Sequence, residues 1–111
     1  FNIAPDDRDV YDPEAWREKI LCSTPEREAL GRILDLGLED TFRLFEQDER
    51  VFSWWDYRMN MFRRKLGLRI DLVLASAAMA RRCTASYIDI EPRRQERPSD
   101  HAPPIAEFGP A

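Results

Sequence analysis

Residues 68–75, Leu-Arg-Ile-Asp-Leu-Val-Leu-Ala, give the strongest strand signal in this sequence of 111 residues. The stretch is almost continuously apolar, which is typical of a strand that is buried on both faces of a sheet. Asp71 interrupts it, and a carboxylate inside a buried strand is costly unless it is paired or hydrogen-bonded. A sheet of this kind needs helices packed against it, so the stretch favours an α/β or α+β fold.

Two helix starts precede this strand in the chain. Asp12 stands before a proline, which predicts a helix over residues 13–20 with Asp12 as its cap. Ser23 and Glu26 have the spacing of a capping box and predict a second helix, which Gly37 ends.

The other predicted elements are short. They are a helical turn over 38–45, strands over 51–57, 85–90 and 106–108, and a helix over 77–82 that Ser76 caps. Residues 91–104 are predicted to form a polar loop. This irregular alternation favours a mixed sheet with helices on it. Two main helices can cover one sheet face only, so we expect a further part on the N-terminal side of Phe1.

Composition excludes several classes of protein. Apolar residues make up 43% and charged residues 34%, which is unlike disordered, collagen-like or disulfide-scaffold chains. The longest nearly apolar run covers residues 72–80, whereas a helix that spans a bilayer needs about 20 residues. We therefore expect no membrane segment. The net charge is −4, but acidic side chains dominate residues 1–50 and basic ones residues 51–111.

Cysteine and histidine usage limits the possible metal sites. Cys22 and Cys83 are the two cysteines and His101 is the one histidine, which nearly excludes a zinc site built from these residues. Any metal would be a hard ion on carboxylates and amides. Two isolated thiols fit a reducing compartment, so we expect a cytoplasmic protein.

Asp71 and His101 are the strongest candidates for chemistry. If the His101 ring donates an N–H to Asp71, the buried acid is satisfied and the imidazole gains a fixed tautomer. Many hydrolytic sites use this arrangement. A structural Asp–His bond at a strand end is the alternative interpretation. Asp100 is adjacent to His101 and could bind a divalent cation, although one carboxylate alone is a weak metal site.

Aromatic and basic side chains follow one another over residues 52–69. Side chains alternate along a strand, so Trp54 and Trp55 cannot both point inward. An exposed ring beside cations could stack on a base or insert into a duplex. The alternative is that the rings belong to the core and pack against other strands. The basic stretch could hold phosphate or be a solvated loop. Its members are Arg58, Arg63, Arg64, Lys65 and Arg69.

Four separated segments, in order, resemble motifs of the exodeoxyribonuclease III family. They are Phe-Asn-Ile-Ala-Pro at 1–5, Phe-Ser-Trp-Trp-Asp-Tyr-Arg at 52–58, Gly-Leu-Arg-Ile-Asp at 67–71 and Arg-Pro-Ser-Asp-His-Ala-Pro at 97–103. The family is part of the endonuclease/exonuclease/phosphatase superfamily, whose fold is a four-layered, deoxyribonuclease-I-like α/β sandwich. The resemblance implies that residues 1–111 are the C-terminal portion of one such domain.

The resemblance also implies an activity. Such enzymes are Mg²⁺-dependent phosphodiesterases (Mn²⁺ is a possible substitute) that act on double-stranded DNA, as 3′–5′ exonucleases and as endonucleases at abasic sites. They usually act as monomers. By position, Asn2 would contact the scissile phosphate or the attacking water. Asp71 would orient His101, which would bind the phosphate or assist proton transfer, and Asp100 with His101 would support the metal site.

The resemblance assigns two further groups of residues. Trp54, Trp55, Leu68 and Ile70 would line the pocket for an extruded abasic sugar, and the basic residues of the 58–69 stretch would contact phosphates. The family's upstream Asp, Glu and Tyr residues are not in this sequence, so we expect the chain alone to be inactive. Two alternatives stay open: a phosphatase of the same superfamily, acting on inositol phosphates or lipids, and a non-catalytic DNA-binding module.

Overall fold

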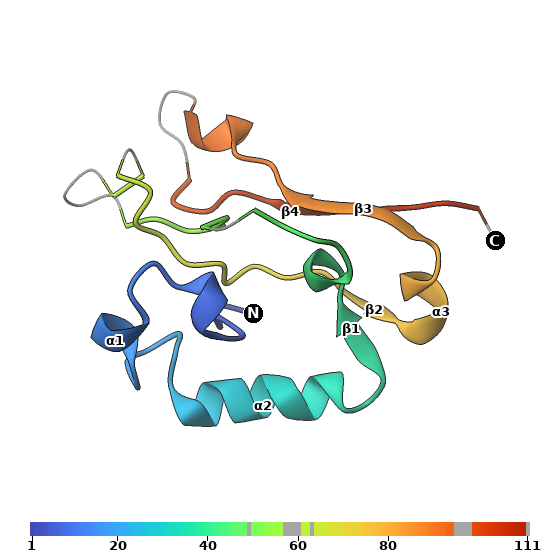
Figure 1. The fold of residues 1–111 in the computed structure, drawn as a ribbon, viewed down its shortest axis with the longest axis horizontal. Coiled ribbons are helices and arrows are strands. Elements are labelled where there is room, and N and C mark those ends of the chain that lie inside the picture. Colours follow the sequence, from blue (N-terminus) through green and yellow to red (C-terminus); the bar gives the residue numbers. More distant parts are fainter. Residues whose placement is uncertain (49, 57–60, 63, 95–98, 111) are drawn as a thin grey trace.

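The computed structural model describes residues 1–48, 50–56, 61–62, 64–94 and 99–110 (Figure 1). Its helices are α1 (Pro13–Trp16), α2 (Thr24–Leu34) and α3 (Ala77–Ala80), and its strands are β1 (Leu38–Asp40), β2 (Leu74–Ser76), β3 (Cys83–Ile88) and β4 (Pro104–Phe108). Short 3₁₀ turns cover Asp7–Asp9, Thr41–Leu44 and Glu91–Arg94.

Two antiparallel strand pairs organise the fold. Strand β1 pairs with β2, and β3 pairs with β4. Figure 1 shows α2 along one side of the molecule and the β3–β4 pair along the opposite side, with α3 leading from β2 into β3. The mixture of helices and strands confirms the predicted class of secondary structure. None of the helices that the structure describes is long and apolar enough to cross a membrane.

The predicted helix starts are confirmed, whereas one helix end is wrong. Ser23 and Glu26 form the capping box of α2, and Gly37 follows this helix with a φ of 100°. Asp12 caps α1 by accepting a hydrogen bond from the Ala15 N–H at 3.2 Å. This helix ends at Trp16 instead of residue 20, because Glu18 turns to a φ of 58° and its carboxylate accepts the Thr24 N–H at 2.9 Å.

The strands predicted over 51–57 and 68–75 are wrong in extent, and residue 57 lies outside the described residues. Of these two stretches only Leu74 and Ala75 belong to a regular strand, β2. The rest is extended chain joined through isolated bridges, in which Leu68 pairs with Val10 on one side and Trp54 on the other. Leu68, Arg69, Ile70, Leu72 and Ala75 of the apolar stretch are buried, whereas Asp71, Val73 and Leu74 are half-buried.

The other short elements differ by a few residues from the prediction. The turn expected over 38–45 is strand β1 followed by the 3₁₀ turn at Thr41–Leu44. The helix expected over 77–82 is α3, which ends at Ala80 and has Ser76 as its cap. The last two predicted strands correspond to β3, which begins at Cys83, and β4, which begins at Pro104.

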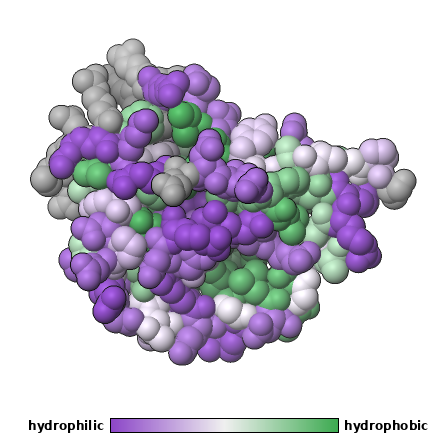
Figure 2. All heavy atoms as spheres, in the orientation of Figure 1, coloured by the Kyte–Doolittle hydropathy of each residue, from purple (hydrophilic) through white to green (hydrophobic). Residues whose placement is uncertain are grey.

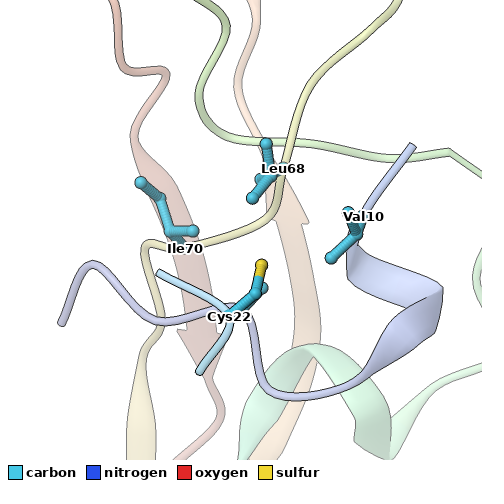
Figure 3. Packing of buried hydrophobic residues seen from close by; sticks show 5 residues of the cluster. Val10, Cys22, Leu68 and Ile70 are labelled. Atoms are coloured by element: carbon cyan, nitrogen blue, oxygen red, sulfur yellow. The ribbon is translucent and has the colours of Figure 1, made fainter. Parts of the chain in front are cut away.

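The main core cluster joins segments that lie far apart in the sequence. Its buried members are Ala4, Val10, Cys22, Leu68 and Ile70, four of which Figure 3 labels. The half-buried rings of Trp16 and Trp54 pack against it. A second cluster contains Phe52, Trp55 and Ala102. Figure 2 shows that hydrophilic residues cover most of the drawn face, with a hydrophobic patch beside α2.

A buried ionic network fixes the segment before Asp71. The Arg69 side chain is 1% exposed, and its Nε donates to Asp9 Oδ1 at 2.7 Å. Its Nη atoms donate to Asp40, and its guanidinium lies 4.5 Å from the centre of the Phe42 ring. Burial alone lowers the pKa of Arg69, but the hydrogen bonds to Asp40 and Asp9 raise this pKa above its usual value. The network ties residues 68–71 to the start of the chain and to β1.

Candidate active site

Asp71 and His101 are in direct contact. The Nδ1 atom of His101 lies 2.7 Å from Asp71 Oδ2, and the two side chains are 35% and 21% exposed. The carboxylate in the apolar stretch therefore has the partner that the sequence analysis predicted. Both side chains remain accessible to a ligand, so the contact lies at the surface and not deep in the core.

Three chain segments bring this pair together. The middle one, residues 52–55, runs between the segment before Asp71 and the segment around His101. Trp54 forms bridges to both Leu68 and His101. The Ala102 N–H donates to Ser53 O at 2.6 Å, and the Leu68 N–H donates to Trp54 O at 3.0 Å. Backbone hydrogen bonds thus set the distance between the acid and the imidazole.

Gly67 allows these segments to approach so closely. A Cβ atom at this position would lie 2.5 Å from Trp54 O and 2.6 Å from the Trp55 ring. Real side chains do not tolerate such distances. Glycine is therefore required here for packing, and it allows the chain that leads into Leu68 to lie directly on the tryptophan pair.

The hydrogen bond to Asp71 decides what the imidazole can do. Because Nδ1–H donates to the carboxylate, Nε2 is the nitrogen that is left for chemistry: an acceptor when the ring is neutral and a donor when it is protonated. This Nε2 lies 3.8 Å from Asp100 Oδ1. The other Asp100 oxygen accepts the Trp54 indole N–H at 3.2 Å. The site can therefore hold a phosphate oxygen or move a proton at one defined nitrogen.

The described residues supply only part of a metal site. Among them, no group of three or more His, Cys, Asp and Glu residues could hold a metal ion. Mg²⁺ often takes one or two carboxylates together with substrate phosphate oxygens. Asp100, whose side chain is 39% exposed, can contribute one such carboxylate. The other ligands would have to come from the substrate or from other parts of a protein.

Asn2 lies beside the segment that carries Asp71. Its backbone N–H donates to Ile70 O at 2.9 Å. Its φ is 56°, a left-handed conformation that Asn adopts more readily than most residues. The side chain is exposed. The structure thus brings all four residues that were predicted for catalysis or metal binding (Asn2, Asp71, Asp100 and His101) to neighbouring segments.

The predicted sugar pocket needs a correction. Leu68 and Ile70 are 0% and 2% exposed and belong to the core. Trp55 is 5% exposed and, with Phe52 and Phe62, lines a hollow whose described lining includes neither Asp71 nor His101. Trp54 is half-buried and stays at the site. Sequence reasoning missed Trp16, whose ring packs edge-on against Trp54 at 6.3 Å between centroids. No periodic pattern in the sequence points to this single aromatic residue at the end of α1.

The predicted phosphate contacts separate into three groups. Arg69 is wrong as a surface contact, because it is buried on Asp9 and Asp40. Arg64 and Lys65 are exposed, in agreement with a surface function. Arg58 and Arg63 lie outside the described residues. The basic stretch is therefore not one continuous surface, since its last member points into the protein.

Comparisons with known proteins cover nearly the whole chain. The sequence profile of the Endonuclease/Exonuclease/phosphatase family matches residues 1–101. The chain is 42% identical to exodeoxyribonuclease III of Haemophilus influenzae, over 97% of this chain and 43% of that protein. In the solved structure of the 3′ phosphatase NExo from Neisseria, bound to a product DNA hairpin, the matching part superposes with a TM-score of 0.94 at 54% identity. This match covers 98% of the present chain and 42% of the other.

A further structural match is more distant in sequence. An AP endonuclease from Archaeoglobus fulgidus superposes with a TM-score of 0.89 at 38% identity, over 96% of this chain and 42% of that one. The chain thus spans less than half the length of each of these relatives. Together the matches confirm the predicted resemblance and the deoxyribonuclease-I-like α/β fold class.

Proposed function

Because this chain belongs to the endonuclease/exonuclease/phosphatase family, we propose that residues 1–111 form the C-terminal portion of an exodeoxyribonuclease III-type nuclease domain. The proposed activity is hydrolysis of phosphodiester bonds in double-stranded DNA, from 3′ ends and at abasic sites. The contact of 2.7 Å between Asp71 and His101 carries this proposal. The names of the relatives, an exodeoxyribonuclease and an AP endonuclease, support it.

In the proposed mechanism each residue of the site acts on the phosphate, the attacking water or the metal. Asp71 holds the Nδ1–H of His101, so that Nε2 faces the scissile phosphate. The protonated ring donates its Nε2–H to a phosphate oxygen, whereas the neutral ring accepts a proton from the attacking water at Nε2. Asn2 contacts the phosphate or the attacking water. Asp100 contributes one ligand to a divalent cation, for which we propose Mg²⁺, with Mn²⁺ as a possible substitute. When bound, such an ion polarises the phosphate and stabilises the developing charge.

The proposed binding surface for DNA contains fewer residues than the sequence predicts, because Leu68, Arg69 and Ile70 are buried. The half-buried Trp54 ring, supported from behind by Leu68 and Ile70, would contact the extruded abasic sugar. An abasic nucleotide costs little to extrude, because it has no base to unstack. The exposed Arg64 and Lys65 would contact phosphates. We further propose that the protein acts as a cytoplasmic monomer.

Cleavage of an abasic duplex tests the proposal. The protein to use is the full product of the gene that encodes residues 1–111. We expect Mg²⁺-dependent nicking, which His101→Ala lowers at least about 10²-fold, the scale of a lost proton-transfer group. Leu36→Ala is the control, because this side chain is 81% exposed. A near-wild-type rate for His101→Ala would contradict the assignment.

The chain by itself is expected to be inactive, because among the described residues beside His101 only Asp100 is left to bind a metal, since Asp71 is bonded to the imidazole. Mg²⁺-dependent nicking by the purified 111-residue chain would refute this expectation.

One rival activity has specific support. The 54% identity to a protein described as a 3′ phosphatase favours removal of a 3′ phosphate from DNA. A duplex with a 3′ phosphate and a second one with an internal abasic site separate the two activities.

The same assays test the two alternatives that the sequence left open. Phosphate release from a soluble phosphoester, but not from DNA, would favour a phosphatase that acts on inositol phosphates or lipids. Binding of DNA with neither reaction would favour a non-catalytic module.

A further inference from the structure

Ser53 contacts both segments that carry the catalytic pair. Its side chain is completely buried, with an exposed fraction of 0%. The hydroxyl oxygen accepts the backbone N–H of Ile70 at 3.0 Å and that of Asp71 at 3.1 Å. Its own carbonyl accepts the Ala102 N–H at 2.6 Å. One residue thus binds the backbone next to His101 and the backbone of Asp71 itself.

These hydrogen bonds replace a missing strand ladder. Residues 68–71 are extended, but they are joined to residue 54 through a single bridge at Leu68. The N–H groups of Ile70 and Asp71 therefore need another acceptor, because a buried N–H without one destabilises the folded chain. A serine oxygen has two lone pairs, which is the number that two converging N–H groups require.

The geometry of the catalytic contact depends on this arrangement. Fixing the Asp71 peptide fixes the direction of its Cα–Cβ bond, and hence where the carboxylate meets the His101 ring. The carbonyl of Ser53 fixes the opposite side through Ala102. We propose that Ser53 is a positioning residue: it holds Asp71 at hydrogen-bonding distance from His101 Nδ1 and so selects the Nδ1–H tautomer. This inference rests on the function proposed above for the pair.

The tautomer of His101 provides a direct test. His101 is the one histidine of the chain, so ¹⁵N NMR of the ring gives a single, unambiguous pair of nitrogen signals. The spectra are recorded at a pH above which the ring ¹⁵N signals no longer change, so that they report the neutral ring. We expect the wild-type chain to show the Nδ1–H form. In Ser53→Ala we expect loss of this dominance, with the Nε2–H form at least equally populated.

Ser76→Ala is the matched control. It also removes a serine oxygen that accepts a backbone N–H, that of Met79 at 3.3 Å, but it does so at the start of α3. Loss of such a cap lowers the stability of the helix. We expect this variant to be less stable than the wild type and to keep the wild-type tautomer. Equal tautomer changes in the two variants would overturn the proposal, because they would reflect general destabilisation.

A folded Ser53→Ala chain with the wild-type tautomer would likewise overturn it and leave Ser53 as a purely structural residue. If Ser53→Ala does not fold, Ser53→Cys decides, since a thiol is a weaker acceptor of similar shape. A partial gain of the Nε2–H form in this variant supports the proposal, and an unchanged tautomer overturns it.

The nuclease function is tested separately, because the tautomer is measured without DNA or metal. In the full product of the gene we expect Ser53→Ala to lower kcat about 10-fold or more at unchanged KM, since misplacement of reacting groups can cost about 10²-fold. A tautomer change in a protein that cleaves no DNA would count against the nuclease function, and an unchanged tautomer in an active nuclease would count against positioning by Ser53.

Discussion

Arg69 and Asp71 lie two residues apart in one apolar stretch. The sequence correctly predicts the partner of Asp71, but it wrongly predicts that Arg69 lies at the surface. Asp71 is anomalous where it stands, and the single histidine is an obvious partner, so their contact could be predicted from chemistry. Arg69 follows several exposed or basic positions and looks like one more surface cation. Its partners Asp9 and Asp40 are 60 and 29 residues away, and no local pattern connects them to it.

The burial of Arg69 leads to a prediction about stability. Arg69→Met removes the cation between Asp9 and Asp40, and Asp9 is itself 0% exposed. Loss of one partner of a buried ion pair costs about 3–5 kcal/mol, and Arg43, which also donates to Asp9 Oδ1 at 2.5 Å, keeps the expected loss near the lower end of this range. We therefore expect a free energy of unfolding lower by that amount, measured by urea denaturation with tryptophan fluorescence.

Arg94→Met is the control for this measurement. Arg94 pairs with Glu91 at the surface, where the side chains are 57% and 71% exposed. Exposed ion pairs contribute about 0–1 kcal/mol. Similar losses of stability in the two variants would show that the Arg69 network contributes no more than a surface pair.

At the scale of elements, helix starts could be predicted and strand lengths could not. The caps at Asp12, Ser23 and Ser76 use side chains that bond to backbone groups only a few residues away, so the sequence contains the whole interaction. A strand depends on which distant segment lies beside it. Residues 68–73 have strand composition, but their neighbours contact them at single bridges, so no regular ladder forms there.

At Gly67 two distant segments approach each other closely, and this contact leads to a prediction about stability. Gly67→Ala would place a methyl group 2.5 Å from the Trp54 carbonyl oxygen, a backbone atom that cannot rotate away. We expect a loss of about 1–3 kcal/mol or more in the free energy of unfolding, as for overpacked cores. Heat or urea denaturation measures it.

Gly31→Ala is the matched change in the same protein. Gly31 lies in α2, and a Cβ there would meet nothing within 4 Å. Alanine is the better helix former, so we expect a gain of about 0.5–1 kcal/mol. The two glycine variants should change stability in opposite directions. A stabilised Gly67→Ala variant would be incompatible with the described packing of the Trp54 segment on Gly67.

At the scale of the whole molecule, the core is built from non-local contacts that composition alone does not reveal. Cys22 is one example. It comes before the capping box of α2, where the sequence gives no reason to expect a buried residue, and it packs on Val10, Leu68 and Ile70 (Figure 3). The same cluster supports Trp54, so the integrity of the fold and the shape of the site depend on the same residues.

Burial of Cys22 makes the stability of the whole chain depend on alkaline pH. Burial raises the pKa of this thiol above its ordinary value of 9.0, and the nearby Arg27 offsets this only in part. The unfolded chain binds its thiol proton less tightly, so the stabilisation from Cys22 is complete below about pH 9 and is lost as the pH rises through the folded pKa.

Cys22→Ala should therefore lose less stability than the wild type between neutral pH and about pH 10.5, as urea midpoints would show. Cys83→Ala is the control variant at the other cysteine, which is half-buried and lies outside this cluster. If Cys22→Ala and the wild type lose stability in parallel, the thiol at position 22 ionises equally well in the folded and unfolded chain and cannot be buried as described.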